Sequence, residues 1–188
     1  MSEILLRKIE IKDLDSYLEL TKPSRLYHKF NGPYFKKSTE NELKTKIQNL
    51  KKQIENGEYP NRSLMVVDEE KDVLIGEVSW YWKSEETKWM EIGIVIFNED
   101  YWGQGIGYKA LRKWIDRVFD EHKDIVRLGL TTWSGNERMM NLAEKLGFVL
   151  EARYRKARIV EDQYYDSISY GILREEWENN NKKTEKLV

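Results

Sequence analysis

The sequence contains no cysteine and only three prolines among its 188 residues. The absence of cysteine excludes disulfides, thiolate metal sites and a covalent acyl-enzyme formed on sulfur. No apolar run approaches the ~20 residues that a membrane-spanning helix needs, and residues 1–4 do not have the pattern of a signal peptide. We therefore expect a cytoplasmic protein that does not bind membranes.

An excess of charge of one sign is also lacking, since the formal net charge is −1. Without a basic field, bulk binding to nucleic acid is not indicated. Two histidines and no cysteine show no metal-ligand spacing, so we predict no metal site. Hydrophobic residues make up 40% of the chain and charged residues 35%, which suits a globular protein with a solvated exterior.

The hydrophobic pattern predicts strands and helices that alternate along one mixed α/β domain at 1–177, followed by a polar and frayed tail at 178–188. A capping box formed by Thr39 and Glu42 predicts the start of one helix, and Gly57 its end. The other helices are expected at 13–20, through the apolar stripe at 111–119, and from Asn136. Strands are expected at 5–11, 63–67, 73–82, 89–97, 127–132, 149–158 and 164–173.

The most informative segment is 101–111, where Gly103, Gly105 and Gly107 alternate at the start of an amphipathic helix. An apolar run at 92–97 comes directly before it. Glycine lets the backbone approach an anion closely, and the first N–H groups of a helix have no partner within the helix. Since the helix dipole adds partial positive charge there, the segment predicts a cradle for a pyrophosphate.

Glycine-rich loops at helix starts occur in several classes of protein. A nucleoside-triphosphate loop would end in Gly-Lys-Ser/Thr, but Tyr108 follows Gly107. The dinucleotide fingerprint is formally satisfied by Gly105, Gly107 and Ala110, yet the acidic residue expected at the end of the next strand is missing. A tight turn whose glycines serve only the backbone geometry also stays open.

A second motif lies about 30 residues downstream, where Asn136 opens a helix that ends in Glu-Lys-Leu-Gly-Phe at 144–148. Together the two motifs resemble the GNAT superfamily of acyl-CoA-dependent N-acetyltransferases. The resemblance extends from Leu5 to Leu173 and is greatest to the branch that acetylates N-terminal amines of ribosomal proteins. It implies an α/β fold with a mixed, mostly antiparallel central sheet flanked by helices, and a splay between the two central strands.

The resemblance also implies acetyl-CoA as co-substrate and a direct attack by a primary amine. Asn136 would bind the pantetheine arm, although Asn is equally suited to a plain helix N-cap. The family usually has Arg or Gln where this chain has Trp102. The cofactor-binding candidates are Ile94, Val95 and Ile96, acting through main chain, with Trp102, Gly103, Gln104, Gly105, Ile106, Gly107, Tyr108 and Asn136.

The acid and base are less defined by the resemblance. Glu91 and Glu77 are the candidates for the general base, because each lies on a predicted central strand. The positions where the family places a Tyr or Ser proton donor carry Ala143 and Met139 here. Solvent, Tyr154 or Ser134 would then have to protonate the departing thiolate.

The acceptor is predicted only by class, as a small-molecule or peptide amine. In the family the segment at 27–35 helps to form the acceptor groove, and here it contains His28, Tyr34 and Phe35. An aromatic cluster at 80–82 and Trp89 could stack on a cation, or it could be ordinary packing. Family habit suggests a homodimer. Two alternative functions stay open, a non-catalytic acyl-CoA-binding module and a dinucleotide-binding protein.

Overall fold

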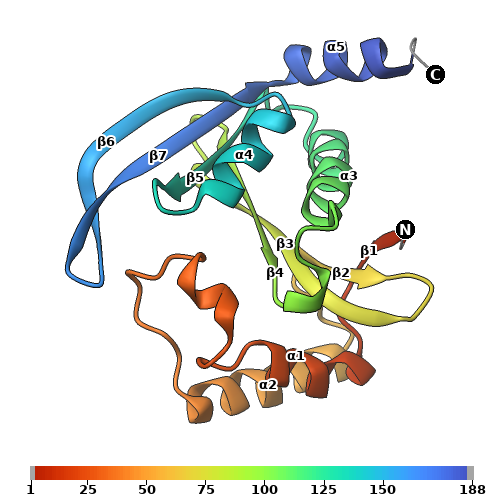
Figure 1. Cartoon of the computed structure of the whole chain (residues 1–188). Helices are drawn as coiled ribbons and strands as arrows, with labels where there is room; N and C mark the ends of the chain where they lie inside the picture. The colour runs from red at the N-terminus through yellow and green to blue at the C-terminus, as the bar shows by residue number, and fades with distance from the viewer. Residues whose placement is uncertain (1–2, 186–188) are drawn as a thin grey trace. The chain divides into compact units, whose positions relative to one another are not determined.

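The computed structural model describes residues 3–185, with side chains for 3–180 (Figure 1). Strands and helices alternate along these residues as the sequence predicts. The strands are β1 (Ile4–Arg7), β2 (Ser63–Asp68), β3 (Val73–Ser84), β4 (Trp89–Ile96), β5 (Arg127–Trp133), β6 (Val149–Val160) and β7 (Gln163–Leu173). The α-helices are α1 (Leu14–Leu20), α2 (Glu40–Glu55), α3 (Ile106–Glu121), α4 (Glu137–Lys145) and α5 (Arg174–Glu185), with 3-10 helices η1 (Ile11–Asp13), η2 (Leu26–Lys29) and η3 (Glu99–Tyr101).

The strands form a seven-stranded sheet in the order β1-β2-β3-β4-β5-β7-β6. Strands β4 and β5 run parallel and pair at their amino-terminal ends, through Met90 with Leu128 and Glu91 with Gly129. The pairs β1–β2, β2–β3, β5–β7 and β6–β7 are antiparallel. The predicted mixed, mostly antiparallel sheet is therefore confirmed.

The chain divides into two compact units. Unit 1 comprises Met1–Ser79 and Ile94–Leu111, and unit 2 comprises Trp80–Gly93 and Arg112–Val188. The glycine segment and the strand end before it belong to unit 1, together with Glu77. Glu91, Asn136 and Tyr154 belong to unit 2.

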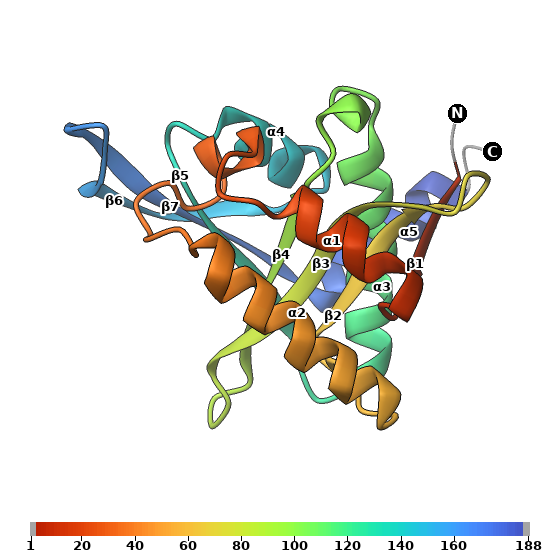
Figure 2. The same cartoon turned by 90° about the horizontal axis from the view of Figure 1, so that it is seen from below.

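In unit 1, helices α1 and α2 lie side by side in both views (Figures 1 and 2). The Thr39 side chain accepts from the Glu42 N–H while the Glu42 carboxylate accepts from the Thr39 N–H, so the predicted capping box is confirmed. Gly57 follows the helix with a left-handed φ of 79°, as a glycine after a helix end does. Buried side chains of α1, α2, β2 and β3, together with Ile9, Tyr27 of η2 and Phe97 after β4, form one core cluster: Ile9, Leu14, Tyr17, Tyr27, Leu50, Ile54, Met65, Val67, Leu74 and Phe97.

In unit 2, helix α3 buries Trp114, Ile115 and Val118 on the stripe that the sequence predicts. Two side chains of helix α5 bind α3 and the residues that follow it. The Arg174 guanidinium donates to the carbonyl oxygens of Phe119, His122 and Ile125. The Trp177 indole N–H donates to the Asp116 carboxylate. The tail predicted to fray from residue 178 continues as helix through Glu185. Residues 186–188 lie outside the described part of the chain.

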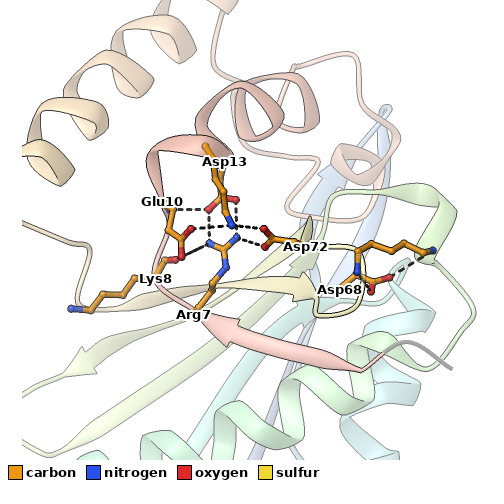
Figure 3. Close-up of polar contacts among 8 residues, drawn as sticks. Arg7, Lys8, Glu10, Asp13, Asp68 and Asp72 are labelled. Carbon is orange, nitrogen blue, oxygen red and sulfur yellow. Dashed lines mark hydrogen bonds and ion pairs between the residues drawn. The ribbon is translucent and has the colours of Figure 1, made fainter.

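The first strand is shorter than predicted and ends at Arg7. The reason is local, because the Asp13 carboxylate accepts from the Glu10 N–H at 2.8 Å and turns the chain into η1 (Figure 3). Asp13 is 4% exposed and holds the Arg7 guanidinium through two bonds of 2.6 and 2.9 Å. Asp72, half exposed, reaches the same guanidinium at 3.3 Å. The hydrogen bonds to the Asp13 carboxylate are the largest of the effects that raise the pKa of Arg7.

We expect Asp13→Asn to lower the free energy of unfolding by about 3 kcal/mol, because it removes one charge of a largely buried ion pair. The matched control is Asp72→Asn, which removes the charge of an exposed partner of the same arginine. Asparagine tolerates the left-handed φ of 51° at that position. We expect the control to cost less than about 1 kcal/mol. Urea unfolding of both variants measures the difference, and equal losses would contradict the prediction.

Candidate active site

The glycine loop lies between η3 and α3 in unit 1. Gly103 and Gly105 have left-handed φ angles of 74° and 75°, which L side chains rarely adopt. A Cβ added at either position would meet no atom within 4 Å, so open space lies beside both backbones. Gly107 lies within the first turn of α3. At Gly103 and Gly105 glycine is therefore required by the backbone conformation and leaves the loop accessible.

Helix α3 begins at this loop, and the Lys109 N–H donates to the Gly105 carbonyl oxygen at 3.1 Å. The first N–H groups of any α-helix have no acceptor within the helix, and its dipole places partial positive charge there. An exposed glycine loop opening a 16-residue helix therefore fits an anionic pyrophosphate.

Trp102, at the start of the loop, is directed toward other groups of unit 1. Its indole N–H donates to the Ile96 carbonyl oxygen at 2.9 Å. Its ring meets the Phe30 ring edge to face, with centroids 5.7 Å apart. Where the related family usually has a polar side chain, this chain uses an aromatic one that holds the strand end before the loop.

The strand end that carries Ile94, Val95 and Ile96 is half-buried, and Val95 packs against the core of unit 1. A Cβ on Gly76 would come within 2.3 Å of the Val95 carbonyl oxygen. Only glycine lets β3 approach the backbone of β4 so closely here. Gly76 thus helps to set the path of the main chain at 94–96, which is predicted to face the cofactor. The sequence analysis did not identify this role of Gly76.

Asn136 is the N-cap of α4 in unit 2, because its Oδ1 accepts from the Met139 N–H at 3.2 Å. The N-cap interpretation of this residue is therefore confirmed. Its side-chain amide also carries N–H donors, so binding to a pantetheine arm stays a prediction. Of the two positions where the related family has a proton donor, Ala143 is fully buried and Met139 is half-buried.

Glu91 is a buried carboxylate in unit 2, with 3% of its surface exposed. The Tyr81 hydroxyl donates to its Oε2, and the Thr131 hydroxyl donates to its Oε1 at 3.1 Å. The Lys83 ammonium lies 4.0 Å from Oε1. The two hydrogen bonds and the nearby ammonium compensate for burying the Glu91 carboxylate, which would otherwise be costly. Sequence reasoning named Glu91 but missed its partners, although alternation along β3 places Tyr81 and Lys83 on one face.

Glu77, the other candidate base, is half-buried in unit 1 and accepts from the Tyr17 hydroxyl at 3.1 Å. The Lys46 ammonium donates to the same hydroxyl oxygen at 3.3 Å. Burial and the Glu77 charge both raise the pKa of Tyr17, so this phenol stays protonated. The sequence did not reveal this chain of contacts, because Tyr17 and Glu77 are 60 residues apart.

The remaining hydroxyl candidates lie in unit 2. Tyr154 is 60% exposed, next to an irregularity in the pairing of β6 with β7. Ser134 accepts from the Asp166 N–H at 3.0 Å and is thus engaged in a loop contact. Tyr154 is the more exposed of the two hydroxyls, whereas Ser134 is half-buried, although its own O–H can still donate.

The segment at 27–35, predicted to border an acceptor, is partly ordered by its own aromatic rings. Tyr27 is buried and stacks on His28 with centroids 4.0 Å apart. Burial lowers the pKa of His28, whereas burial and the Glu77 charge raise the pKa of Tyr27 to about 12. Phe35 is 69% exposed and meets Tyr34. The segment therefore overlaps a short helix, η2, and contains one buried side chain, Tyr27.

The aromatic cluster predicted at 80–82 is split between two faces of β3. Trp80 and Trp82 meet each other and the half-buried His122 edge to face, so packing is the role that these contacts support. The His122 N–H continues the hydrogen bonding of α3 by donating to the Val118 carbonyl oxygen at 3.0 Å, and its ring belongs to this cluster. Tyr81 instead reaches Glu91.

A strand that runs into an exposed glycine loop at a helix start is typical of α/β proteins that bind a cofactor through its phosphates. The family described as "Acetyltransferase (GNAT) domain" matches residues 3–149. The chain therefore belongs to the GNAT acetyltransferase family.

Two relatives from Bacillus subtilis (strain 168) are similar in sequence. One is named "Putative ribosomal N-acetyltransferase YdaF", at 31% identity over 105 residues, 56% of each chain. The other is the "Uncharacterized N-acetyltransferase YnaD", at 27% identity over 93% of this chain and 95% of the relative. The match to YdaF thus spans about half of that protein's length.

Among solved structures, the spermidine N-acetyltransferase from Vibrio cholerae in complex with CoA and spermine shares the fold. Its TM-score is 0.72 at 21% sequence identity, covering 93% of this chain and 97% of that one.

Among the residues that the present structure describes, no helix is long and apolar enough to cross a membrane.

Proposed function

We propose that this protein is an N-acetyltransferase that transfers an acetyl group from acetyl-CoA to a primary amine. The observation that carries the proposal is the glycine loop, with Gly103 and Gly105 in left-handed conformations beside open space at the start of α3. Membership of the GNAT family supports the choice of acetyl-CoA over other phosphate-bearing cofactors.

In this proposal the backbone of 103–108 binds the pyrophosphate, and the main chain of 94–96 and the Asn136 amide bind the pantetheine arm. When bound, acetyl-CoA supplies the acetyl group as an activated thioester. The chain contributes the binding, the orientation and the removal of a proton from the acceptor.

Glu91 is the proposed general base. An amine with a pKa of about 8–10 enters as an ammonium and must lose a proton before it can attack. Because Glu91 is 3% exposed and Tyr81 is 44% exposed, we propose that the proton reaches the carboxylate through the Tyr81 hydroxyl. Tyr81 takes the proton from the ammonium as it gives its own to Glu91, so the charge of Tyr81 is unchanged.

After the attack, the amide nitrogen gives up a second proton and the departing sulfur gains one. Ala143 and Met139 have no proton to give, so the exposed Tyr154 or solvent fills this role in the proposal. The acceptor is a peptide N-terminal amine or a small amine, since the similar proteins include one named "Putative ribosomal N-acetyltransferase YdaF" and a spermidine N-acetyltransferase. The cytoplasmic location, the domain bounds and the homodimer stay predictions.

The proposal is tested by thermal unfolding with acetyl-CoA and, in parallel, with a nicotinamide dinucleotide. A ligand at 100 times its dissociation constant adds about 2.7 kcal/mol of stability. We expect a rise in Tm with acetyl-CoA alone, followed by release of CoA thiol in a screen of peptide and polyamine acceptors. A response only to the dinucleotide would overturn the proposal. Binding of acetyl-CoA without turnover on any amine would favour a non-catalytic binding module.

A further inference from the structure

The residues just before the glycine loop contact one short segment, Leu26–Phe30, which precedes it by about 70 positions in the sequence. The Glu99 carboxylate accepts from the Leu26 N–H at 2.9 Å. The Phe30 ring meets the Trp102 ring edge to face, at 5.7 Å and 82°. Both contacts lie within unit 1, and together they connect the two ends of this segment with the entrance of the loop.

The segment has little regular structure of its own. It consists of η2 and Phe30, with the Phe30 N–H donating to the Tyr27 carbonyl oxygen at 3.0 Å. A single 3-10 turn is a weak unit, so its position depends on side-chain contacts. Tyr27 supplies one by meeting Phe97 at 5.2 Å, directly after β4. The contacts that hold the Leu26–Phe30 segment therefore include Phe97, which lies between β4 and the glycine loop.

The entrance is also fixed from its other side. The Trp102 indole N–H donates to the Ile96 carbonyl oxygen at 2.9 Å. The Tyr101 hydroxyl donates to the fully buried Asp68 at 3.0 Å. Trp102 thus joins the strand end, the start of the loop and the Leu26–Phe30 segment.

We propose that Trp102 and Phe30 are positioning residues that couple occupation of the glycine loop to the order of the Leu26–Phe30 segment. The inference rests on the proposed function, in which the loop binds CoA. Coupling of this kind is reciprocal, so a ligand that orders the segment is itself bound more tightly when the segment is in place. The family resemblance predicts that residues 27–35 border the acceptor, so in this proposal a bound CoA prepares the protein for its second substrate.

Hydrogen–deuterium exchange of the full chain, with and without CoA, is the test. We expect CoA to slow exchange of the amides at 26–31 as well as those of the loop. Phe30→Leu keeps an apolar side chain but loses the ring contact with Trp102. It should lose the protection at 26–31 and raise the dissociation constant for CoA by roughly three- to tenfold, the usual range for one aromatic pair.

Three further variants make the test specific. Phe35→Leu removes a neighbouring ring that is 69% exposed and meets Tyr34, so it should bind CoA as the unchanged protein does and retain the protection. If Phe30→Leu does not fold, Glu99→Ala removes the other contact from the loop side, and Glu99→Gln should restore it because an amide oxygen can still accept from the Leu26 N–H.

The outcomes separate the two proposals. Loss of protection and affinity in Phe30→Leu, or in Glu99→Ala, but not in Phe35→Leu supports the coupling. If the unchanged protein binds CoA while exchange at 26–31 stays the same, the coupling is overturned and the proposed function stands. If calorimetry detects no binding of CoA to the unchanged protein, the proposed function fails and the coupling fails with it.

Discussion

Gly105→Val is expected to weaken CoA binding by about 100-fold or more. Two physical effects act together at this residue. A β-branched side chain is strongly disfavoured at a φ of 75°, so the loop must change its conformation. The new side chain would also occupy the open space beside the loop, where the pyrophosphate is proposed to lie. Two lost hydrogen bonds to a charged group, at about 1.5–3 kcal/mol each, already account for such a loss.

The matched control is Gly57→Val, in the same unit. Gly57 has a φ of 79° and nothing within 4 Å of an added Cβ, so the backbone strain and the open surroundings are alike. It follows α2 and takes no part in the proposed cradle. We expect both variants to lose similar stability in thermal unfolding, whereas calorimetry shows CoA binding lost only in Gly105→Val. Equal affinity in the two variants would remove the glycine loop from the site.

Glu91→Gln is expected to lower kcat by about 100-fold or more, the usual range for a general base, while the dissociation constant for acetyl-CoA stays nearly unchanged. The amide keeps the size of the carboxylate. Its oxygen can still accept from the Tyr81 hydroxyl while its NH2 group donates to the Thr131 hydroxyl oxygen, but the amide cannot take up a proton. Tyr81→Phe should lower kcat as well, since the proposed path for the proton passes through that hydroxyl.

Glu77→Gln is the control that separates the two candidate bases. Its carboxylate accepts from the buried Tyr17 hydroxyl, whose raised pKa keeps that proton in place. We therefore expect Glu77→Gln to retain most of its turnover. Steady-state rates with one fixed amine, together with calorimetry for acetyl-CoA, distinguish these results. Turnover that is unchanged in Glu91→Gln but lost in Glu77→Gln would exchange the two roles.

Several elements could be predicted from the sequence because their causes are local. The Thr39–Glu42 capping box, the end of α2 at Gly57 and the start of α3 all depend on residues within a few positions of each other. The end of β1 was missed although its cause is equally local: the Asp13 carboxylate accepts from the Glu10 N–H, but Glu10 is not one of the residues that usually begin a helix as N-cap. The helix at 174–185 was missed because Arg174 and Trp177 fasten it to α3 and the residues after it, which composition does not reveal.

The sequence by itself determined the glycine loop, its place between a strand and a helix, and the family to which its motifs belong. These features follow from backbone conformation and short-range spacing, which a linear pattern records. Only the tertiary structure decided what surrounds the candidate residues: Tyr81 and Thr131 at Glu91, Tyr17 at Glu77, and Phe30 at Trp102. Most of these partners lie 40 to 72 positions away in sequence, and burial brings them together to satisfy charges and fill space that no local pattern specifies.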